Sequence, residues 1–148
     1  MPEISQFCTF SLDYLLLGIE LQRVQEVVRG IDMTPVPLAP AVVTGLINLR
    51  GQIVTAIDLR KRLNLKPRST ESVAMSVVIR TDEGPVSVLV DEIGDVVEVG
   101  EDTFETPPET LQGAARAVIV GVHRLAGRLL HVLDTERVCD TGEGLEVQ

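Results

Sequence analysis

One stretch of the sequence decides the fold: Gly45-Leu-Ile-Asn-Leu-Arg-Gly-Gln-Ile-Val-Thr-Ala-Ile-Asp-Leu-Arg-Lys-Arg-Leu63. Two apolar runs flank a short polar link that contains Arg50 and Gly51, and this pattern predicts a β-hairpin whose turn needs glycine at a positive backbone φ. Asp58 closes the second strand, where its carboxylate can accept hydrogen bonds from the N–H groups of a short helix at 59–63. The stretch therefore predicts a strand, a glycine turn, a strand and a capped helical turn.

The same pattern returns near the C-terminus, so the chain contains a repeat. A gapless alignment superimposes the turn glycines and the capping aspartates: Gly45 on Gly121, Gly51 on Gly127, and Asp58 on Asp134. A weaker echo superimposes residues 21–28 on residues 90–97. Two echoes in the same order predict two similar β lobes, each too small to bury an adequate core alone, with an apolar interface between them. The repeated glycines and aspartates are therefore expected to serve the fold.

The other segments predict short strands separated by turns. Alternating or β-branched runs occupy 7–12, 15–21, 23–29, 73–79, 86–90, 93–99, 117–122 and 128–133. Short strands of this kind are typical of small closed or nearly closed barrels, which remove exposed sheet edges. We predict an all-β fold with a few short helices over residues 1–148. Its lobes are expected at about 14–72 and 73–133, with the polar segment 64–72 as the crossing and terminal segments that cross between the lobes.

The composition excludes several classes of function. The 148 residues carry 22 acidic and 13 basic side chains, a formal charge of −9, whereas a nucleic-acid binder needs a basic excess to neutralise phosphates. The same charge opposes adhesion to an anionic membrane surface. We see neither a leader segment nor an apolar stretch long enough to span a bilayer, so we expect a cytosolic protein without direct membrane contact. Aromatic residues make up only 3%, so the core must be aliphatic.

No catalytic, metal-binding or cofactor-binding motif is recognisable. The sequence lacks GxSxG, GxGxxG and GxxxxGK[ST] patterns, and Cys8 and Cys139 belong to no CxxC pair or Cys/His cluster. Asp58 and Asp134 hold equivalent positions in the two lobes, as the carboxylate dyad of a two-lobed aspartyl hydrolase would. Their contexts lack the Asp-Thr-Gly or Asp-Ser-Gly signature, and helix capping explains both residues better. We therefore expect no enzymatic activity, no metal and no cofactor.

Two charged features of the opening stretch have both a structural and a functional interpretation. The cluster Arg60-Lys61-Arg62 is either a solvated helix face or a contact for an acidic partner. Arg50 is either an exposed turn residue or the partner of a nearby carboxylate, for which Glu26 is the candidate. A surface ion pair adds little to stability, so the value of this one would lie in orienting a contact surface.

Three segments carry a family resemblance: Val24-Gln-Glu-Val27, Gly45-Leu-Ile-Asn-Leu-Arg-Gly51 and Ile53-Val-Thr-Ala-Ile-Asp-Leu-Arg60. Together they are similar to a hallmark that reads V-Q-E-[VI], then G-x-[IV]-N-[LI]-R-G, then an apolar strand ending in D-L-R. This hallmark is that of the CheW family, the coupling proteins of bacterial chemotaxis. The resemblance extends from about Gln6 to Val138, so the chain is expected to be a single CheW-like domain.

The resemblance implies two five-stranded SH3-like β-barrel lobes packed on a shared aliphatic core. It also implies a non-enzymatic signalling adaptor that couples the cytoplasmic tip of a chemoreceptor to the regulatory domain of the histidine kinase CheA. Such an adaptor is cytoplasmic and is recruited to membrane receptor arrays. Carried over by position, the expected contacts are Val24, Glu26, Val27 and Arg50 for the receptor, and Val43, Thr44 and Gly45 for the kinase. An adaptor of another chemosensory pathway, for surface motility or gene control, fits the same residues.

Overall fold

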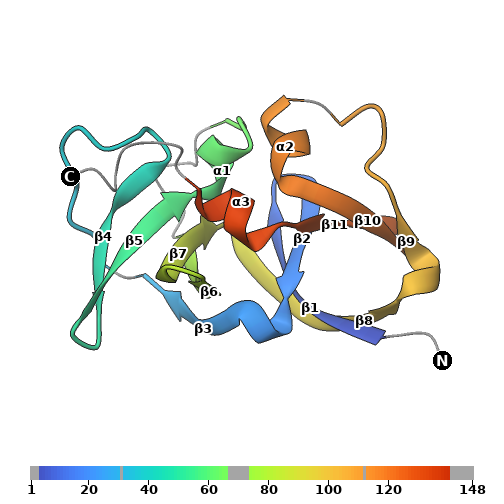
Figure 1. Ribbon diagram of the computed structural model, residues 1–148, viewed down its shortest axis with the longest axis horizontal. Coiled ribbons are helices and arrows are strands. Elements are labelled where there is room, and N and C mark those ends of the chain that lie inside the picture. Colours follow the sequence, from blue (N-terminus) through green and yellow to red (C-terminus); the bar gives the residue numbers. More distant parts are fainter. Residues whose placement is uncertain (1–3, 31, 67–73, 112, 141–148) are drawn as a thin grey trace.

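Two β-sheets lie side by side in the computed structural model, which describes residues 4–30, 32–66, 74–111 and 113–140 (Figure 1). The five-stranded sheet has the order β3-β6-β7-β5-β4, and its strands are β3 (Val24–Arg29), β4 (Val43–Leu49), β5 (Gln52–Asp58), β6 (Met75–Thr81) and β7 (Gly84–Val90). The six-stranded sheet has the order β8-β1-β2-β11-β10-β9, and its strands are β1 (Ile4–Leu12), β2 (Leu15–Glu20), β8 (Glu92–Gly100), β9 (Phe104–Glu105), β10 (Ile119–Leu125) and β11 (Arg128–Leu133). The helical segments are short: η1 (Leu21–Arg23), α1 (Leu59–Arg62), η2 (Glu101–Thr103), α2 (Gly113–Val118) and α3 (Thr135–Cys139).

The predicted all-β architecture with a few short helices and two lobes is confirmed. Five strands is the right number for one sheet, whereas the other sheet gains a sixth strand, β9, of only two residues. The SH3-like barrel form of the lobes stays a prediction.

The two repeats exchange their first hairpins. β6 pairs with β3 and β7 pairs in parallel with β5, so the hairpin that opens the second repeat completes the sheet of the first. In the same way, β1 pairs with β8 and β2 pairs in parallel with β11. The expected lobe boundaries, 14–72 and 73–133, therefore do not coincide with the sheets. Those boundaries assume that each repeat pairs within itself, as consecutive elements usually do. Equivalent strands of the two repeats offer similar edges, so sequence similarity does not reveal which copy supplies the partner.

The chain crosses between the sheets at two places, both outside the segment expected from the sequence. It leaves the six-stranded sheet through η1, which joins β2 to β3, and it returns at Asp91, which joins β7 to β8. The polar segment 64–72 is no crossing, because it lies between α1, which follows β5, and β6. Both β5 and β6 belong to the five-stranded sheet. Residues 67–73 lie outside the described residues.

The largest buried cluster is shared by both sheets, which confirms the aliphatic core between the lobes. Its members come from both sheets and from the short helices: Phe10, Leu12, Leu15, Leu17, Ile19, Leu59, Leu63, Val77, Ile79, Val88, Val90, Val118, Ile119, Leu133 and Val138. Smaller clusters around Ile47 and around Phe7 lie within one lobe each. Since most of the buried apolar surface is common to both lobes, each lobe depends on the other to keep its inner face dry.

A close approach of the backbone explains the glycine that begins each repeated stretch. Beyond β3, Thr34 bridges to Leu46 of β4 through two backbone hydrogen bonds of 2.8 Å. In the other sheet, β9 pairs with β10 at the equivalent place. A Cβ atom at Gly45 would lie 2.6 Å from the carbonyl oxygen of Thr34, and one at Gly121 would lie 2.8 Å from that of Glu105. Glycine therefore lets an earlier segment of the chain pair with β4 in one sheet and with β10 in the other.

Candidate functional site

The turn between β4 and β5 carries the arginine that the sequence singles out. Leu49 pairs with Gln52, so Arg50 and Gly51 form a two-residue loop with φ values of 53° and 88°. Two positive φ angles are the signature of a type I′ turn, whose twist matches that of the flanking strands. The side chain of Asn48 accepts a hydrogen bond of 2.9 Å from the Gly51 N–H, which fixes the loop. The predicted glycine turn is confirmed, and Arg50 shares its left-handed backbone.

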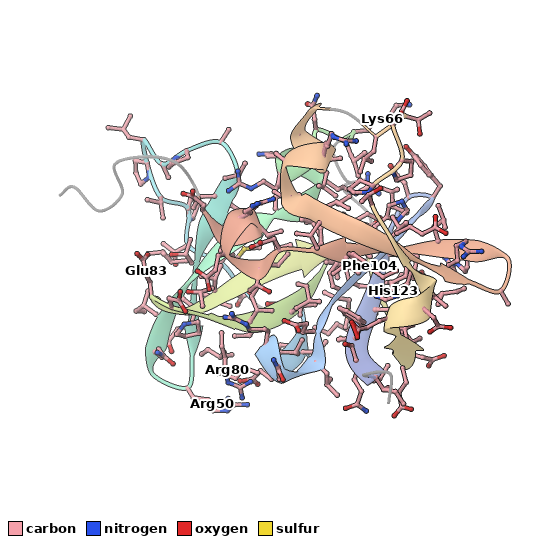
Figure 2. All side chains as sticks on the ribbon, turned by 45° about the vertical axis from the view of Figure 1, so that its right-hand side comes forward. Arg50, Lys66, Arg80, Glu83, Phe104 and His123 are labelled. Atoms are coloured by element: carbon pink, nitrogen blue, oxygen red, sulfur yellow. The ribbon has the colours of Figure 1, made fainter. Side chains whose placement is uncertain are left out.

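Arg50 forms a two-pronged ion pair with Glu26, as the sequence suggested. Nη1 lies 2.5 Å from Oε2 and Nη2 lies 2.6 Å from Oε1. Glu26 is on β3 and Arg50 follows β4, the two ends of the strand order, so the sheet curves until its outer strands approach each other. The side chain of Arg50 is 73% exposed, whereas that of Glu26 is 18% exposed. Figure 2 shows Arg50 at the tip of its hairpin.

The two partners stabilise each other's charged forms. Hydrogen bonding from Arg50 lowers the pKa of the Glu26 carboxyl, with a smaller contribution from the positive charge of the guanidinium. The same hydrogen bond raises the pKa of Arg50. Both groups are therefore ionised over the physiological range, and the guanidinium is held in one orientation.

The two valines expected beside this pair, Val24 and Val27, do not contact the same surface as the ion pair. Val24 is partly buried and packs against the shared core. Val27 is 39% exposed, while its neighbours Glu26 and Val28 are partly buried, so Val27 points away from the ion pair. The structure thus brings together Glu26 and Arg50 but gives Val24 to the core and Val27 to the opposite face of β3.

The expected kinase segment lies on β4, the last strand of the five-stranded sheet. Val43 and Thr44 are partly buried and Gly45 is buried under the segment that contains Thr34. The hydroxyl oxygen of Thr44 is buried and has no hydrogen-bond partner among the described residues. Gly45 therefore serves the closure of the sheet and offers no side chain, so a contact here would use Val43, Thr44 and the backbone.

The interpretation of Arg60 as part of a solvated or partner-binding basic cluster is wrong. Arg60 is 8% exposed, and its guanidinium pairs with Asp13, in the β1–β2 turn, and with Asp91. Hydrogen bonding to Asp91 is the main reason that the pKa of Arg60 is raised. Neither aspartate was predicted as a partner from the sequence, since they lie 47 and 31 residues from Arg60 along the chain. A signal was available, since Arg60 lies beside a capping aspartate that the repeat already marked as structural.

Asp58 and Asp134 cap helices, which leaves no carboxylate dyad for a hydrolase. Oδ1 of Asp58 accepts a hydrogen bond of 2.9 Å from the Arg60 N–H at the start of α1. Oδ1 of Asp134 accepts one of 3.0 Å from the Arg137 N–H at the start of α3. This capping geometry confirms the sequence prediction for both residues and argues against the two-lobed aspartyl hydrolase.

The histidines are engaged in the structure of the six-stranded sheet. Nδ1 of His123 lies 2.8 Å from the hydroxyl oxygen of Thr103, and the ring packs against those of Phe7 and Phe104, with centroids 5.6 and 5.1 Å away. Figure 2 shows His123 beside Phe104. His131 Nδ1 donates to the carbonyl oxygen of Leu16 at 3.0 Å. Within the described ranges, no group of three or more His, Cys, Asp or Glu residues is arranged to hold a metal ion.

Exposed apolar side chains recur at equivalent positions of the two repeats. Val27 on β3 and Val96 on β8 are 39% and 49% exposed, and Ile53 on β5 and Leu129 on β11 are 61% and 36% exposed. Each pair lies on matching strands of the two sheets. Scattered exposed apolar residues are common, but their recurrence gives both lobes a small apolar surface of the kind that protein contacts use.

None of the helices in the described part of the chain is long and apolar enough to cross a membrane.

Comparison with known proteins points to one family. Residues 6–143 match the family model described as a CheW-like domain. The chain is 32% identical over 142 residues to the chemotaxis protein CheW of Treponema pallidum, an alignment that covers 93% of this chain and 84% of that protein. It is 33% identical over 123 residues to the chemotaxis protein CheW of Bacillus subtilis, covering 83% and 79%. The crystal structure of the scaffolding protein TtCheW from Thermoanaerobacter tengcongensis superimposes with a TM-score of 0.79 at 27% identity, covering 90% of each chain.

Proposed function

The chain belongs to the CheW family of chemotaxis adaptors, and on that premise we propose that it couples a chemoreceptor to the histidine kinase CheA. The adaptor carries out no catalysis: it binds the cytoplasmic tip of the receptor at one surface and the regulatory domain of the kinase at another. Holding two partners on one scaffold raises their effective concentration for each other. The place of action is the cytoplasmic side of a membrane receptor array, where the adaptor is recruited by these contacts.

The observation that carries this proposal is the exposed ion pair between Arg50 and Glu26. Arg50 holds a left-handed φ of 53°, which non-glycine residues rarely adopt, and strained backbone of this kind gathers at functional sites. The second repeat has Ala126 at the equivalent position, so the hairpin does not require an arginine to fold. A guanidinium has five N–H donors, and Glu26 fixes the group while leaving other donors directed to a partner. We assign the receptor contact to Arg50 and Glu26; Val24 supports β3 from the core side, and Val27 joins the contact only if the partner also covers the other face of β3.

The kinase contact belongs to the outer strand of the same sheet. Val43 and Thr44 lie on β4, and the buried hydroxyl of Thr44 lacks a hydrogen-bond partner among the described residues. A buried hydroxyl without a partner is costly, and a bound protein supplies the missing partner only if β4 shifts to expose this oxygen. Gly45 takes part through its backbone, since its side-chain position is filled by the Thr34 segment.

A three-component assembly assay tests both contacts together. The purified chain is mixed with a receptor cytoplasmic fragment and CheA, and both co-sedimentation and kinase autophosphorylation are measured. We expect the wild-type chain to bring kinase and receptor into one complex and to raise autophosphorylation. Arg50→Glu should prevent receptor-dependent activation, because it places a carboxylate against Glu26 and reverses the exposed charge.

Arg128→Glu is the matched control, since Arg128 is an exposed arginine in the equivalent hairpin of the second repeat. This control makes the same change of net charge and should assemble like the wild type. A wild-type chain that neither co-sediments with the two partners nor changes autophosphorylation would overturn the proposed function. Equal loss in both variants would show that net charge, and not the Arg50 contact, controls assembly.

A further inference from the structure

A cluster of charges around the buried side chain of Arg60, which we call the Arg60 clamp, holds one of the two places where the chain crosses between the sheets. It consists of Arg60 on α1, Asp13 in the β1–β2 turn, and Asp91 at the crossing from β7 to β8. Arg60 Nε donates to Asp91 Oδ1 at 3.0 Å and Nη2 donates to Asp91 Oδ2 at 2.5 Å. Nη2 also donates to Asp13 Oδ1 at 2.7 Å, and Nη1 donates to the carbonyl oxygen of Lys66 at 2.8 Å. The side chain of Arg60, from the lobe of the five-stranded sheet, therefore binds both the β1–β2 turn of the other lobe and Asp91 in the connection between the lobes.

The second crossing has its own cluster, the Glu136 clamp, which consists of Glu136, Arg23 and the backbone of Asp82. Glu136 on α3 accepts a hydrogen bond of 3.2 Å from Arg23 at the end of η1, the crossing from β2 to β3. The same oxygen of Glu136 accepts one of 3.1 Å from the Asp82 N–H in the β6–β7 turn. Arg60 of α1 thus contacts the β1–β2 turn, which belongs to the six-stranded sheet, and Glu136 of α3 contacts the β6–β7 turn, which belongs to the five-stranded sheet.

The two clamps occupy equivalent places in the repeat but have opposite charges. The alignment of Asp58 with Asp134 superimposes Arg60 on Glu136, and the weaker echo, extended towards the N-terminus, superimposes Asp13 on Asp82. These opposite charges prevent the two helices from exchanging partners. Arg60 would meet the like charge of Arg23, and Glu136 would meet those of the aspartates that bind Arg60. The clamps differ in strength, since the side chain of Arg60 is 10% exposed whereas those of Arg23 and Glu136 are 34% and 42% exposed.

We propose that Arg60, assisted by Glu136, is a positioning residue that sets the angle between the two lobes and thereby aligns the adaptor's contacts. The shared core attracts the lobes without direction, because burial of apolar surface is proportional to area and not to angle. A planar guanidinium that satisfies two carboxylates and a carbonyl from separate segments has a narrow range of geometries. This inference rests on the proposed function for its consequence in signalling, but the effect on lobe orientation is independent of that function.

The lobe orientation is measured by the distance between spin labels on the two sheets. Labels are attached to Gln52→Cys and Arg128→Cys, exposed and equivalent positions of β5 and β11, in a Cys139→Ser background that leaves only the buried Cys8. We expect Arg60→Met to broaden or shift the distance distribution relative to the parent chain. Lys61→Met removes the same charge from an exposed position on α1 and should leave the distribution unchanged. An unchanged distribution in folded Arg60→Met would overturn the proposal.

Arg60→Lys keeps the test decisive if Arg60→Met does not fold. A lysine retains the charge but cannot form the fork to both oxygens of Asp91, so we expect a folded chain with an intermediate broadening. Glu136→Gln removes the charge of the weaker clamp and should broaden the distribution less than either change at Arg60. Distributions identical to that of the parent in both folded variants would equally overturn the proposal.

The same variants are then tested in the three-component assembly assay. We expect Arg60→Met, or Arg60→Lys in its place, to bind a receptor fragment alone and CheA alone as the parent does. Receptor-dependent activation should fall by about fivefold or more, which is a typical size for coupling between two sites. If the parent chain itself fails to activate the kinase, the proposed function is wrong while the distance measurement still decides the role of Arg60. If activation is intact despite altered distances, the link between lobe angle and signalling is wrong.

Discussion

The guanidinium of Arg50 spans both carboxylate oxygens of Glu26, at 2.5 and 2.6 Å, although Glu26 lies on β3 and Arg50 follows β4, the strands at opposite ends of the sheet order. A strained turn and a curved sheet are both needed to bring them together. The pair therefore reports on the shape of the whole lobe, and it places a fixed positive group at an exposed hairpin tip. This combination distinguishes it from an ordinary surface ion pair.

Arg50→Glu is expected to abolish receptor-dependent assembly while the melting temperature falls by only a few degrees. The reason is that the Arg50 side chain is 73% exposed, so solvent screens most of the lost attraction. Co-sedimentation and differential scanning calorimetry measure the two effects. The exchanged pair Glu26→Arg with Arg50→Glu should regain thermal stability but not assembly, and a large thermal loss for Arg50→Glu alone would show that Arg50 is structural.

Gly45→Ala and Gly121→Ala should each destabilise the chain by about 1–3 kcal/mol, since the added methyl group would press on the carbonyl of Thr34 at one site and on the ring of Phe104 and the carbonyl of Glu105 at the other. Urea unfolding measures the change. Gly127→Asn is the control, because nothing lies near its Cβ position and asparagine tolerates a positive φ. Similar losses at all three positions would point to chain entropy and not to close approach.

Replacing the helix caps tests the structural role of the repeated aspartates. Asp58→Ala and Asp134→Ala should each cost about 0.5–2 kcal/mol, because each removes the acceptor for an N–H group at a helix start. Asp58→Ser and Asp134→Ser keep an acceptor and should recover most of the stability. No recovery with serine would mean that the carboxylate charge, and not capping, is what the fold uses.

His123 should make the protein less stable in acid. Burial lowers the pKa of His123, a trend that the charge of Asp102 partly opposes, so the unfolded chain binds a proton more readily than the folded one. Stability is then unaffected well above pH 6.5, the ordinary pKa, and is lost as the pH falls below it, until the folded protein also binds the proton. Urea midpoints measured from pH 8 to pH 5 should decline less in His123→Asn than in the wild type. Parallel declines would assign the acid sensitivity to carboxylates instead.

The cysteines should resist alkylation until the chain unfolds. Burial raises the pKa of the Cys139 thiol to about 12, with a smaller contribution from Glu136, and burial also raises the pKa of Cys8. Only the thiolate reacts, so iodoacetamide at pH 8 should modify neither residue in the native state and both in urea. Mass spectrometry counts the adducts, and rapid modification of native Cys139 would show that α3 opens locally.

Local features of the fold could be predicted from the sequence because they depend on neighbouring residues. The turn at Gly51 and the cap at Asp58 follow from backbone preferences within a few residues. The shared core follows from apolar content repeated in two halves that are each too small to fold alone. The pairing of Glu26 with Arg50 was accessible because both residues lie in conspicuous segments, 24 residues apart.

Features that depend on distant pairing could not be predicted in this way. The membership of each hairpin in a sheet depends on a choice between two chemically similar edges. Arg60 lies in a run of three basic residues that resembles a solvated face, and only the folded chain brings Asp13 and Asp91 to it. The burial of Gly45 also depends on a pairing outside its own hairpin, the bridge between Thr34 and Leu46.

The exchanged hairpins have a consequence for the history of the protein. The strand pairing is that of a dimer in which each subunit lends its first hairpin to the other, here written in a single polypeptide. Duplication of a half-length ancestor that formed such a dimer would produce this arrangement without any new contact. Once the copies were fused, each was free to diverge on its surface, so Arg50 and Ala126 now stand at equivalent positions of the two hairpins while the glycines that follow them, Gly51 and Gly127, are the same.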